Sequence, residues 1–281
     1  MTLVPTRAIL DRTTRGRAAF NVVHIETAEA LAGAADDTGL PLILQISENC
    51  VDYHGALAPV AAAVSAIARD ADVPIAVHLD HAVSEALALE AIDFGFGSVM
   101  FDGATLPFAE NVAATRRIVR VAHAAGVLVE AELGEIGGKD GAHAPGVRTD
   151  PVEAVQFATA TGVDALAVAV GSSHAMTDRT AVLDLDLIAR LREAVDIPLV
   201  LHGSSGVGDG HLRAAVAAGI AKVNIATQLT KQYTQAVRRA LADRPALVDS
   251  RTYTRAGRDA VRAEAARLLT LLDAAAPVVS S

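Results

Sequence analysis

The chain has 281 residues, of which 52% are hydrophobic and only 3% aromatic, with no Trp. Ala, Val, Leu and Ile must therefore fill a large core, as they do in barrels whose interiors are layers of branched side chains. A formal net charge of −9 argues against a nucleic-acid surface, which needs clustered Lys and Arg to displace counterions from phosphates. It still allows a phosphorylated metabolite as a ligand, because a few local donors can hold one phosphate.

The single cysteine, Cys50, excludes an internal disulfide and a cysteine-rich metal knuckle. A lone thiol is typical of a reduced intracellular protein. Residues 1–20 lack the continuous apolar stretch of a signal peptide, and no window approaches the roughly 18 uninterrupted apolar residues of a membrane span. We therefore expect a cytoplasmic protein that binds neither membrane nor nucleic acid.

Short apolar runs alternate along the chain with longer stretches of helical period, and Gly, Pro or Asp marks the joins. Near-continuous apolar character, rather than strict alternation, is typical of parallel strands buried on both faces. The predicted strands are residues 18–23, 40–47, 74–80, 97–103, 127–133, 165–171, 197–203 and 221–227. The stretches between them, such as 26–39 and 107–126, predict crossover helices.

Eight strands with helical crossovers predict an α/β protein, a single (β/α)8 TIM barrel. An open doubly wound sheet is the alternative. Because no Pro/Gly/Ser-rich linker divides the chain, we expect one domain over residues 1–281. Two segments depart from the rhythm. Residues 134–149 form a Gly-rich loop long enough to act as a lid, and residues 228–281 form a C-terminal helical extension that could cover a barrel end or reach a partner subunit.

Polar residues follow the carboxyl ends of the predicted strands, where barrel enzymes build their active sites. In chain order they are Asn21, Ser47, Asp80 with His81, Asp102, Glu132, His174, His202 and Asn224. Asp and Asn also cap helices, and a strand-end His often only satisfies a backbone carbonyl. Because unpaired polar groups are costly to bury, their convergence on one mouth predicts a functional site.

Three histidines of this set, His81, His174 and His202, predict a metal centre. Neutral imidazoles are zinc ligands, and three of them with an open fourth position describe a catalytic zinc site. Asp80 and His81 are adjacent, and successive strand residues point to opposite faces. Both can serve one site only if the third strand has ended by His81, so that the chain turns there.

A Gly/Ser loop, HGSSGVGDG at residues 202–210, leads into a helix predicted to begin near residue 209. Exposed N–H groups in such a loop, before a helix N-terminus, favour an anion. NIAT at residues 224–227 closes the eighth strand in the same way. Loops after strands seven and eight commonly hold phosphate in barrels, so we predict a phosphate site there.

With these motifs in place, the sequence resembles the class II, zinc-dependent fructose-bisphosphate and tagatose-bisphosphate aldolases. The similarity runs from AFNVVHIET at residues 19–27 through DSRTYTRAG at residues 249–257. The blocks between them, in the family's order, are HLDH (78–81), SVMFDGA (98–104), LPFAENV (106–112), EAELGEIGG (130–138), GSSH (171–174), LHGSSG (201–206) and KVNIAT (222–227). The resemblance implies reversible cleavage of a phosphorylated ketose, such as fructose or tagatose 1,6-bisphosphate, to dihydroxyacetone phosphate and an aldehyde.

The resemblance also implies roles for residues. It implies that His81, His174 and His202 bind zinc, that the Glu132 carboxylate lies near the metal, and that Asp80 is the catalytic acid/base. The implied substrate-binding residues are Asn21, Ser47, Gly203, Ser204, Ser205, Asn224, Ala226, Thr227 and Arg251. The C1 phosphate falls to the loops after strands seven and eight, and a monovalent cation (Na⁺ or K⁺) is expected nearby. Arg251 matches the arginine that reaches a neighbouring subunit's site, so a homodimer or homotetramer is implied.

The sequence departs from the family pattern in three places. Ala175 follows GSSH where relatives usually carry Gly, whose backbone lies against phosphate. The loop reads GGKDGAH where relatives usually carry GGEEDG or GGQED, so Asp140 is the expected stand-in for the carboxylate that handles the carbon proton. Glu48 and Asp52 would repel a second phosphate unless they point away, so a ketose monophosphate or a modified sugar acid is an alternative substrate.

Two other functions remain open at this point. A Schiff-base aldolase needs a lysine amine at the site, and the chain offers only Lys139, Lys222 and Lys231. Lys139 lies in the loop, Lys231 in a helix, and Lys222 begins the eighth strand, where packing inside the barrel is expected. A non-catalytic sugar-phosphate-binding barrel would fit the altered loop, but binding alone does not require Asp80 beside the histidines.

Overall fold

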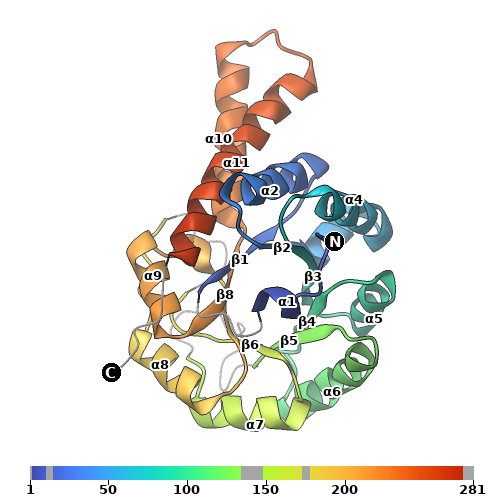
Figure 1. Cartoon of the computed structure of the whole chain (residues 1–281), viewed down its shortest axis with the longest axis vertical. Coiled ribbons are helices and arrows are strands. Elements are labelled where there is room, and N and C mark those ends of the chain that lie inside the picture. Colours follow the sequence, from blue (N-terminus) through green and yellow to red (C-terminus); the bar gives the residue numbers. More distant parts are fainter. Residues whose placement is uncertain (1, 11–14, 134–147, 173–177, 275–281) are drawn as a thin grey trace.

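The computed structural model describes residues 2–10, 15–133, 148–172 and 178–274. Eight parallel strands close into a barrel in chain order, and Figure 1 shows the helices arranged around it. The strands are β1 (Arg17–Asn21), β2 (Leu42–Ser47), β3 (Ile75–Ala82), β4 (Ser98–Phe101), β5 (Leu128–Glu132), β6 (Ala165–Ala167), β7 (Leu199–Leu201) and β8 (Ile220–Ile225). Each predicted strand overlaps one of these, so the TIM-barrel prediction is confirmed and the open sheet is excluded.

The helices that follow the strands cover the outside of the barrel, and one short helix, α1, precedes β1. They are α1 (Arg7–Leu10), α2 (Ile25–Thr38), α3 (Glu48–His54), α4 (Leu57–Asp70), α5 (Glu85–Phe94), α6 (Phe108–Ala124), α7 (Pro151–Thr161), α8 (Leu185–Ala194), α9 (Asp209–Ala218), α10 (Thr227–Asp243) and α11 (Ser250–Asp273), with a 3₁₀ turn, η1, at Ser204–Gly206. Several begin at side-chain caps that satisfy free N–H groups. Ser84, Asp150 and Asp184 accept from the first turns of α5, α7 and α8.

The barrel interior and its outer wall form two separate apolar clusters. Alternate residues of each strand face inward, and the rest pack against the helices. The inner cluster contains Ile9, Leu10, Ala19, Ile43, Ala76, Met100, Leu128, Ala165, Ala167 and Val200. Ile9 and Leu10 come from α1, which lies across the ring of strands in Figure 1. The preceding segment pairs with Ile75, the first residue of β3, so α1 plugs the amino-terminal end.

Above this apolar layer the barrel interior becomes polar. Gln45, His78, Glu130 and Lys222 are almost completely buried, each at most 1% exposed. Lys222 packs inside the barrel, as its place in the sequence predicted. These side chains lie directly beneath the carboxyl-terminal mouth, so they form the floor of any site built there.

The chain past β8 forms a helical hairpin, as the predicted C-terminal extension required. α10 and α11 pack on each other, α11 also packs on α2, and in Figure 1 the joined ends of the two helices extend away from the barrel. α11 is anchored by a buried stripe, Val261, Ala265, Leu268 and Leu272. Residues 275–281 and most of the predicted lid, 134–147, lie outside the described residues.

Within the described part of the chain, no single helix has the length and apolarity needed to cross a membrane. α3 and α4 reach that length only as a pair, and they are bent by 112° at the break between them.

Candidate active site

The turn at the end of β3 is made by a bulge. The expectation that β3 ends by His81 is wrong, because the strand runs to Ala82. The register against β4 shifts between Leu79 and Ala82, and His81 has a φ of 50°, in the left-handed region. A non-glycine residue held there costs about 1–3 kcal/mol. In return Asp80 and His81, which regular pleating would turn to opposite faces, both line the same cleft.

Asp80 is 4% exposed and is held by amide donors on both oxygens. Asn21 Nδ2 donates to Oδ2 at 2.7 Å, and Asn224 Nδ2 donates to Oδ1 at 3.3 Å. Gln45 Nε2 donates in turn to Asn21 Oδ1 at 3.1 Å, which fixes the orientation of the Asn21 amide. Burial opposes ionisation of Asp80, but the charges of His81, His202 and Lys222 outweigh it and lower the pKa of the carboxyl. Asp80 is therefore a carboxylate ready to accept a proton.

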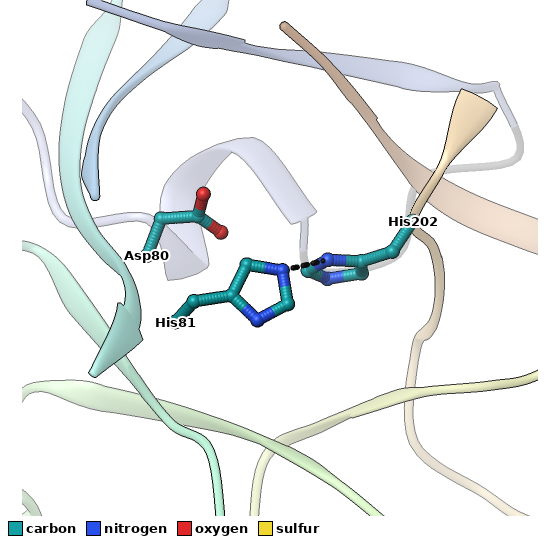
Figure 2. A group of neighbouring side chains, drawn as sticks. All are labelled: Asp80, His81 and His202. Atoms are coloured by element: carbon teal, nitrogen blue, oxygen red, sulfur yellow. Dashed lines mark hydrogen bonds between the residues drawn. The ribbon is translucent and has the colours of Figure 1, made fainter. Parts of the chain in front are cut away.

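The rings of His81 and His202 meet over the centre of the mouth (Figure 2). His81 Nε2 lies 2.8 Å from His202 Nδ1. Behind each ring stands a carboxylate: Asp102 Oδ2 is 2.8 Å from His81 Nδ1, and Glu130 Oε1 is 2.9 Å from His202 Nε2. Since an ionised carboxylate only accepts, each ring donates to its carboxylate and turns its other nitrogen toward the neighbouring ring.

Two nitrogen lone pairs that face each other need a cation between them. In the absence of a metal that cation is a proton. Burial opposes protonation of His81, but the nearby carboxylates Asp80, Asp102 and Glu132 outweigh it and raise the His81 pKa to about 10.

The donors at the mouth suit a divalent metal. The ligand atoms of Asp80, His81 and His202 lie within 4.8 Å of one another, as do those of His81, Asp102 and Glu132. Imidazole nitrogens and carboxylate oxygens are the donor set of zinc, and a carboxylate behind the imidazole is its usual outer support. Two nitrogens bound tetrahedrally at about 2.0–2.1 Å would be separated by about 3.3 Å, so the rings need to part by only about half an ångström.

A buried hydrogen-bond chain runs beneath the mouth. Lys222 Nζ lies 2.7 Å from Glu130 Oε2 and 3.4 Å from His78 Nε2. His78 Nδ1 lies 2.7 Å from Ser98 Oγ, which in turn is bonded to Thr6 next to α1. Burial, together with the charge of Lys222, lowers the His78 pKa well below its usual value. His78 is thus a neutral residue of the floor.

The loops after β7 and β8 form one side of a small cleft of about 70 Å³. It is lined by Asn21, Asp80, His81, His202, Gly203, Ser204, Ser205, Asn224, Ala226 and Thr227. Gly203 has a φ of 64°, which turns the chain into η1, and Ala226 precedes the first turn of α10. Ser204 Oγ donates to the Asn224 carbonyl, and Ser205 Oγ accepts from Gln228 N at 3.1 Å. Backbone N–H groups of a 3₁₀ turn and of a helix N-terminus therefore surround the cleft, an arrangement that favours a phosphate.

Two predicted substrate-binding residues lie away from this cleft. Ser47 neighbours Asp80 in the sheet, but its hydroxyl caps α3 by accepting from Cys50 N at 3.2 Å. Arg251 pairs with Asp249 and lines a separate cleft of about 510 Å³. Neither residue lines the cleft of its own chain.

Of the remaining candidates, Glu132 is 3% exposed and lies at the mouth beside His81 and Asp102. His174, Asp140 and Ala175 lie outside the described residues. The Glu48 carboxylate, expected to repel a second phosphate unless turned away, accepts from Val83 N and Ser84 N at the start of α5.

Sequence reasoning missed Glu130 and Gln45, and it did not pair Asp102 with His81. The signal for Glu130 and Gln45 was their spacing. Each lies two residues before a selected strand-end residue, Glu132 or Ser47, and residues i and i+2 of a strand share a face.

The chain is similar to known aldolases over nearly its whole length. A family profile described as fructose-bisphosphate aldolase class-II matches residues 5–276. A fructose-bisphosphate aldolase from Geobacillus stearothermophilus is 38% identical over 270 residues, 94% of each chain. The crystal structure of the YdjI aldolase from Escherichia coli K12 superposes with a TM-score of 0.84 at 30% identity, covering 98% of this chain and 99% of that one. A putative fructose-1,6-bisphosphate aldolase structure from Coccidioides immitis has a TM-score of 0.81 at 29% identity, covering 93% and 92%.

The matching profile spans nearly the whole chain, and the barrel, the strand-end histidines and the cleft all lie within it. The chain therefore belongs to the class II fructose-bisphosphate aldolase family and is an aldolase, a lyase that acts on carbon–carbon bonds.

Proposed function

We propose that the protein is a zinc-dependent aldolase that cleaves a ketose carrying a C1 phosphate, with fructose or tagatose 1,6-bisphosphate as its substrate. The products would be dihydroxyacetone phosphate and an aldehyde. The observation that carries the proposal is the pair of imidazole nitrogens of His81 and His202, 2.8 Å apart, each ring backed by its own carboxylate.

His81 and His202 would hold the zinc, and His174, from the segment outside the described residues, is proposed as the third ligand. Glu132 is proposed as a carboxylate at the same metal. When bound, zinc supplies a Lewis acid that polarises the ketose carbonyl and stabilises the negative charge that develops as the C3–C4 bond breaks.

Asp80 would act as the general base. Its carboxylate lies in the cleft and is kept ionised, so it can accept the proton of the C4 hydroxyl as the C4 carbonyl of the departing aldehyde forms. The electron pair of the C3–C4 bond stays with the ketone fragment, which must then take a proton at C3. Asp140 is proposed as the residue that delivers it.

The loops after β7 and β8 would bind the C1 phosphate. Gly203, Ser205 and Thr227 line the cleft at the N-termini of η1 and α10, where N–H groups point at an anion. Asn224 Oδ1 is buried and has no hydrogen-bond partner among the described residues, so it offers an acceptor to a substrate hydroxyl. We place the monovalent cation, Na⁺ or K⁺, beside this phosphate.

We also propose a homodimer or homotetramer in which Arg251 of one subunit completes the site of another. The support is that Arg251 lies near the start of α11, where its side chain is 86% exposed and does not line the cleft of its own chain. The buried free thiol of Cys50 supports a reducing, cytoplasmic compartment.

The Schiff-base alternative is disfavoured by the described lysines. Lys222 is fully buried and paired with Glu130, and Lys231 lies on α10 outside the cleft. A nucleophilic amine must be both neutral and reachable by the ketose carbonyl.

The test is metal removal followed by a substrate panel. Chelator-stripped protein, and the same protein reloaded with zinc, are assayed for release of dihydroxyacetone phosphate from fructose 1,6-bisphosphate, tagatose 1,6-bisphosphate, fructose 1-phosphate and fructose 6-phosphate. We expect the stripped protein to lose activity, zinc to restore it, and fructose 6-phosphate to be inert because it lacks the C1 phosphate. Full turnover in excess chelator, or borohydride trapping of substrate on a lysine, would refute the proposal.

A further inference from the structure

The ion pair between Lys222 and Glu130 lies beneath the mouth and touches no surface. Lys222 is fully buried and Glu130 is 1% exposed, and their charged atoms are 2.7 Å apart. Burying two charges is expensive, and apolar residues of similar volume often serve stability as well or better. Packing alone therefore does not explain this pair, since apolar side chains of similar volume could fill the same space.

The contacts of the pair point to a role above it. Glu130 uses one oxygen for Lys222, and its other oxygen, Oε1, lies 2.9 Å from His202 Nε2. An ammonium group only donates, and a carboxylate that neutralises it only accepts. The proton between Glu130 and His202 must therefore sit on the ring nitrogen Nε2, which leaves Nδ1 of the same ring with a lone pair.

That lone pair faces the mouth, because Nδ1 is the atom that lies 2.8 Å from His81 Nε2. Asn224 Nδ2 also approaches His202 Nε2, at 3.0 Å. If Asn224 donated to Nε2, that nitrogen would be the acceptor and the proton of the ring would lie on Nδ1. Asp80 Oδ1 offers the Asn224 amide another acceptor at 3.3 Å, whereas Glu130 Oε1 makes no other hydrogen bond among the described residues. The contact with Glu130 therefore determines which nitrogen of the His202 ring carries the proton.

We propose that Lys222 and Glu130 are positioning residues that act as one unit: Lys222 holds the Glu130 carboxylate in place through one oxygen, and Glu130 uses the other to fix the proton on His202 Nε2, so that Nδ1 is presented to the metal. This inference rests on the proposed function, since it assigns a role toward the zinc at that site. Neither residue lines the cleft, so neither touches substrate. Their effect passes through His202.

The first test reads the proton directly in the metal-free protein. Nitrogen-15 spectra of the histidine rings, with the His202 signal assigned by its loss in His202→Gln, distinguish a protonated Nε2 from a protonated Nδ1. We expect the His202 Nε2 to carry a proton in the wild type. In Glu130→Gln, we expect that preference to be lost, because the Gln side chain can present either its oxygen or its NH₂. A His202 ring protonated only at Nδ1 in the wild type would overturn the inference.

The second test measures zinc affinity by competition with a chromogenic chelator. We expect Glu130→Gln and Lys222→Met each to weaken zinc binding by about 10–100-fold, the range for losing an outer partner of a metal-bound His. The double variant should bind zinc no more weakly than Glu130→Gln alone, because Lys222 acts only through Glu130. Single losses that multiply in the double variant would overturn the claim that the two act as one unit.

His123→Gln is the matched control. His123 Nε2 lies 2.8 Å from Asp164 Oδ2, a similar His–carboxylate pair at the amino-terminal end of the barrel, and its removal should leave zinc affinity unchanged. Far-UV circular dichroism and thermal unfolding identify any variant that does not fold, and the wild-type ring spectrum decides the proton position without any variant of the pair. If the wild type binds no zinc, the proposed function fails. If the wild type binds zinc and Glu130→Gln binds it equally, only this inference fails.

Discussion

The substitution Asp80→Asn tests the role of Asp80 as a general base while leaving the fold intact. The two side chains have nearly the same shape, and both carboxylate oxygens now accept from amides, Asn21 Nδ2 at 2.7 Å and Asn224 Nδ2 at 3.3 Å. An Asn at position 80 can accept one of these bonds but must turn its own NH₂ toward the other donor. Losing one hydrogen bond to a charged group costs about 1.5–3 kcal/mol, offset by the removal of a buried charge. The fold should therefore survive.

The catalytic cost should be much larger. A positioned general base contributes about 10²–10⁴-fold to rate, equivalent to about 2.7–5.4 kcal/mol of barrier. We expect kcat for ketose bisphosphate cleavage to fall by that factor in Asp80→Asn. Because the Asp80 carboxylate also helps to raise the His81 pKa, zinc content is measured on the same samples.

Asp164→Asn is the matched control for this change. Asp164 precedes β6 at the amino-terminal end of the barrel, where it accepts from Arg7 and from Val129 N. This variant should lose some thermal stability and keep wild-type kcat. A kcat for zinc-loaded Asp80→Asn within about tenfold of wild type would refute the base role, since it lies below the range for general base catalysis.

Four further outcomes are expected. His81, with a pKa of about 10, keeps its proton at neutral pH, and zinc must displace that proton. Zinc affinity should therefore rise with pH by up to about tenfold per unit and level off above about pH 10. Calorimetry in buffers of different ionisation enthalpy measures the proton release, and its absence would contradict the prediction. For the same reason the metal-free protein should lose stability relative to His81→Gln as pH rises from 6.5 toward about 10, because a raised folded pKa stabilises only while the proton is bound. Gly103→Ala should destabilise the fold by about 1–3 kcal/mol, because the added Cβ would clash with Asn111 Oδ1, an atom held by a hydrogen bond from Thr115; unchanged thermal unfolding would contradict this reading. Arg251→Ala and Asp80→Asn should each be nearly inactive alone, and mixing them should restore activity if subunits exchange and share sites; no recovery in proven mixed oligomers would contradict the shared site.

The barrel could be predicted because the requirement that each strand be apolar acts on consecutive residues of the sequence. A parallel strand covered on both faces must be apolar, and β2 and β7 can be recognised in the sequence as the apolar runs LILQIS and LVL. The residues at the strand ends could be recognised as well, since burying a polar group after such a run is costly unless a partner or ligand compensates it.

Other features depend on contacts between distant strands. Lys222 and Glu130 lie 92 positions apart and become partners only when β5 and β8 are closed into one barrel. The bulge at His81 could not be predicted because left-handed backbone there is imposed by the register between β3 and β4 rather than by a local glycine. Glu48 looked repulsive to phosphate in the sequence, yet in the fold its carboxylate accepts backbone N–H groups at the start of α5.

The most direct measurement is anomalous X-ray scattering at the zinc edge from crystals of the zinc-loaded protein. One strong peak is predicted over the mouth of the barrel, about 2.0–2.1 Å from both His81 Nε2 and His202 Nδ1. A zinc peak bound elsewhere on the chain, with the two rings still joined at 2.8 Å through a proton, would contradict the account.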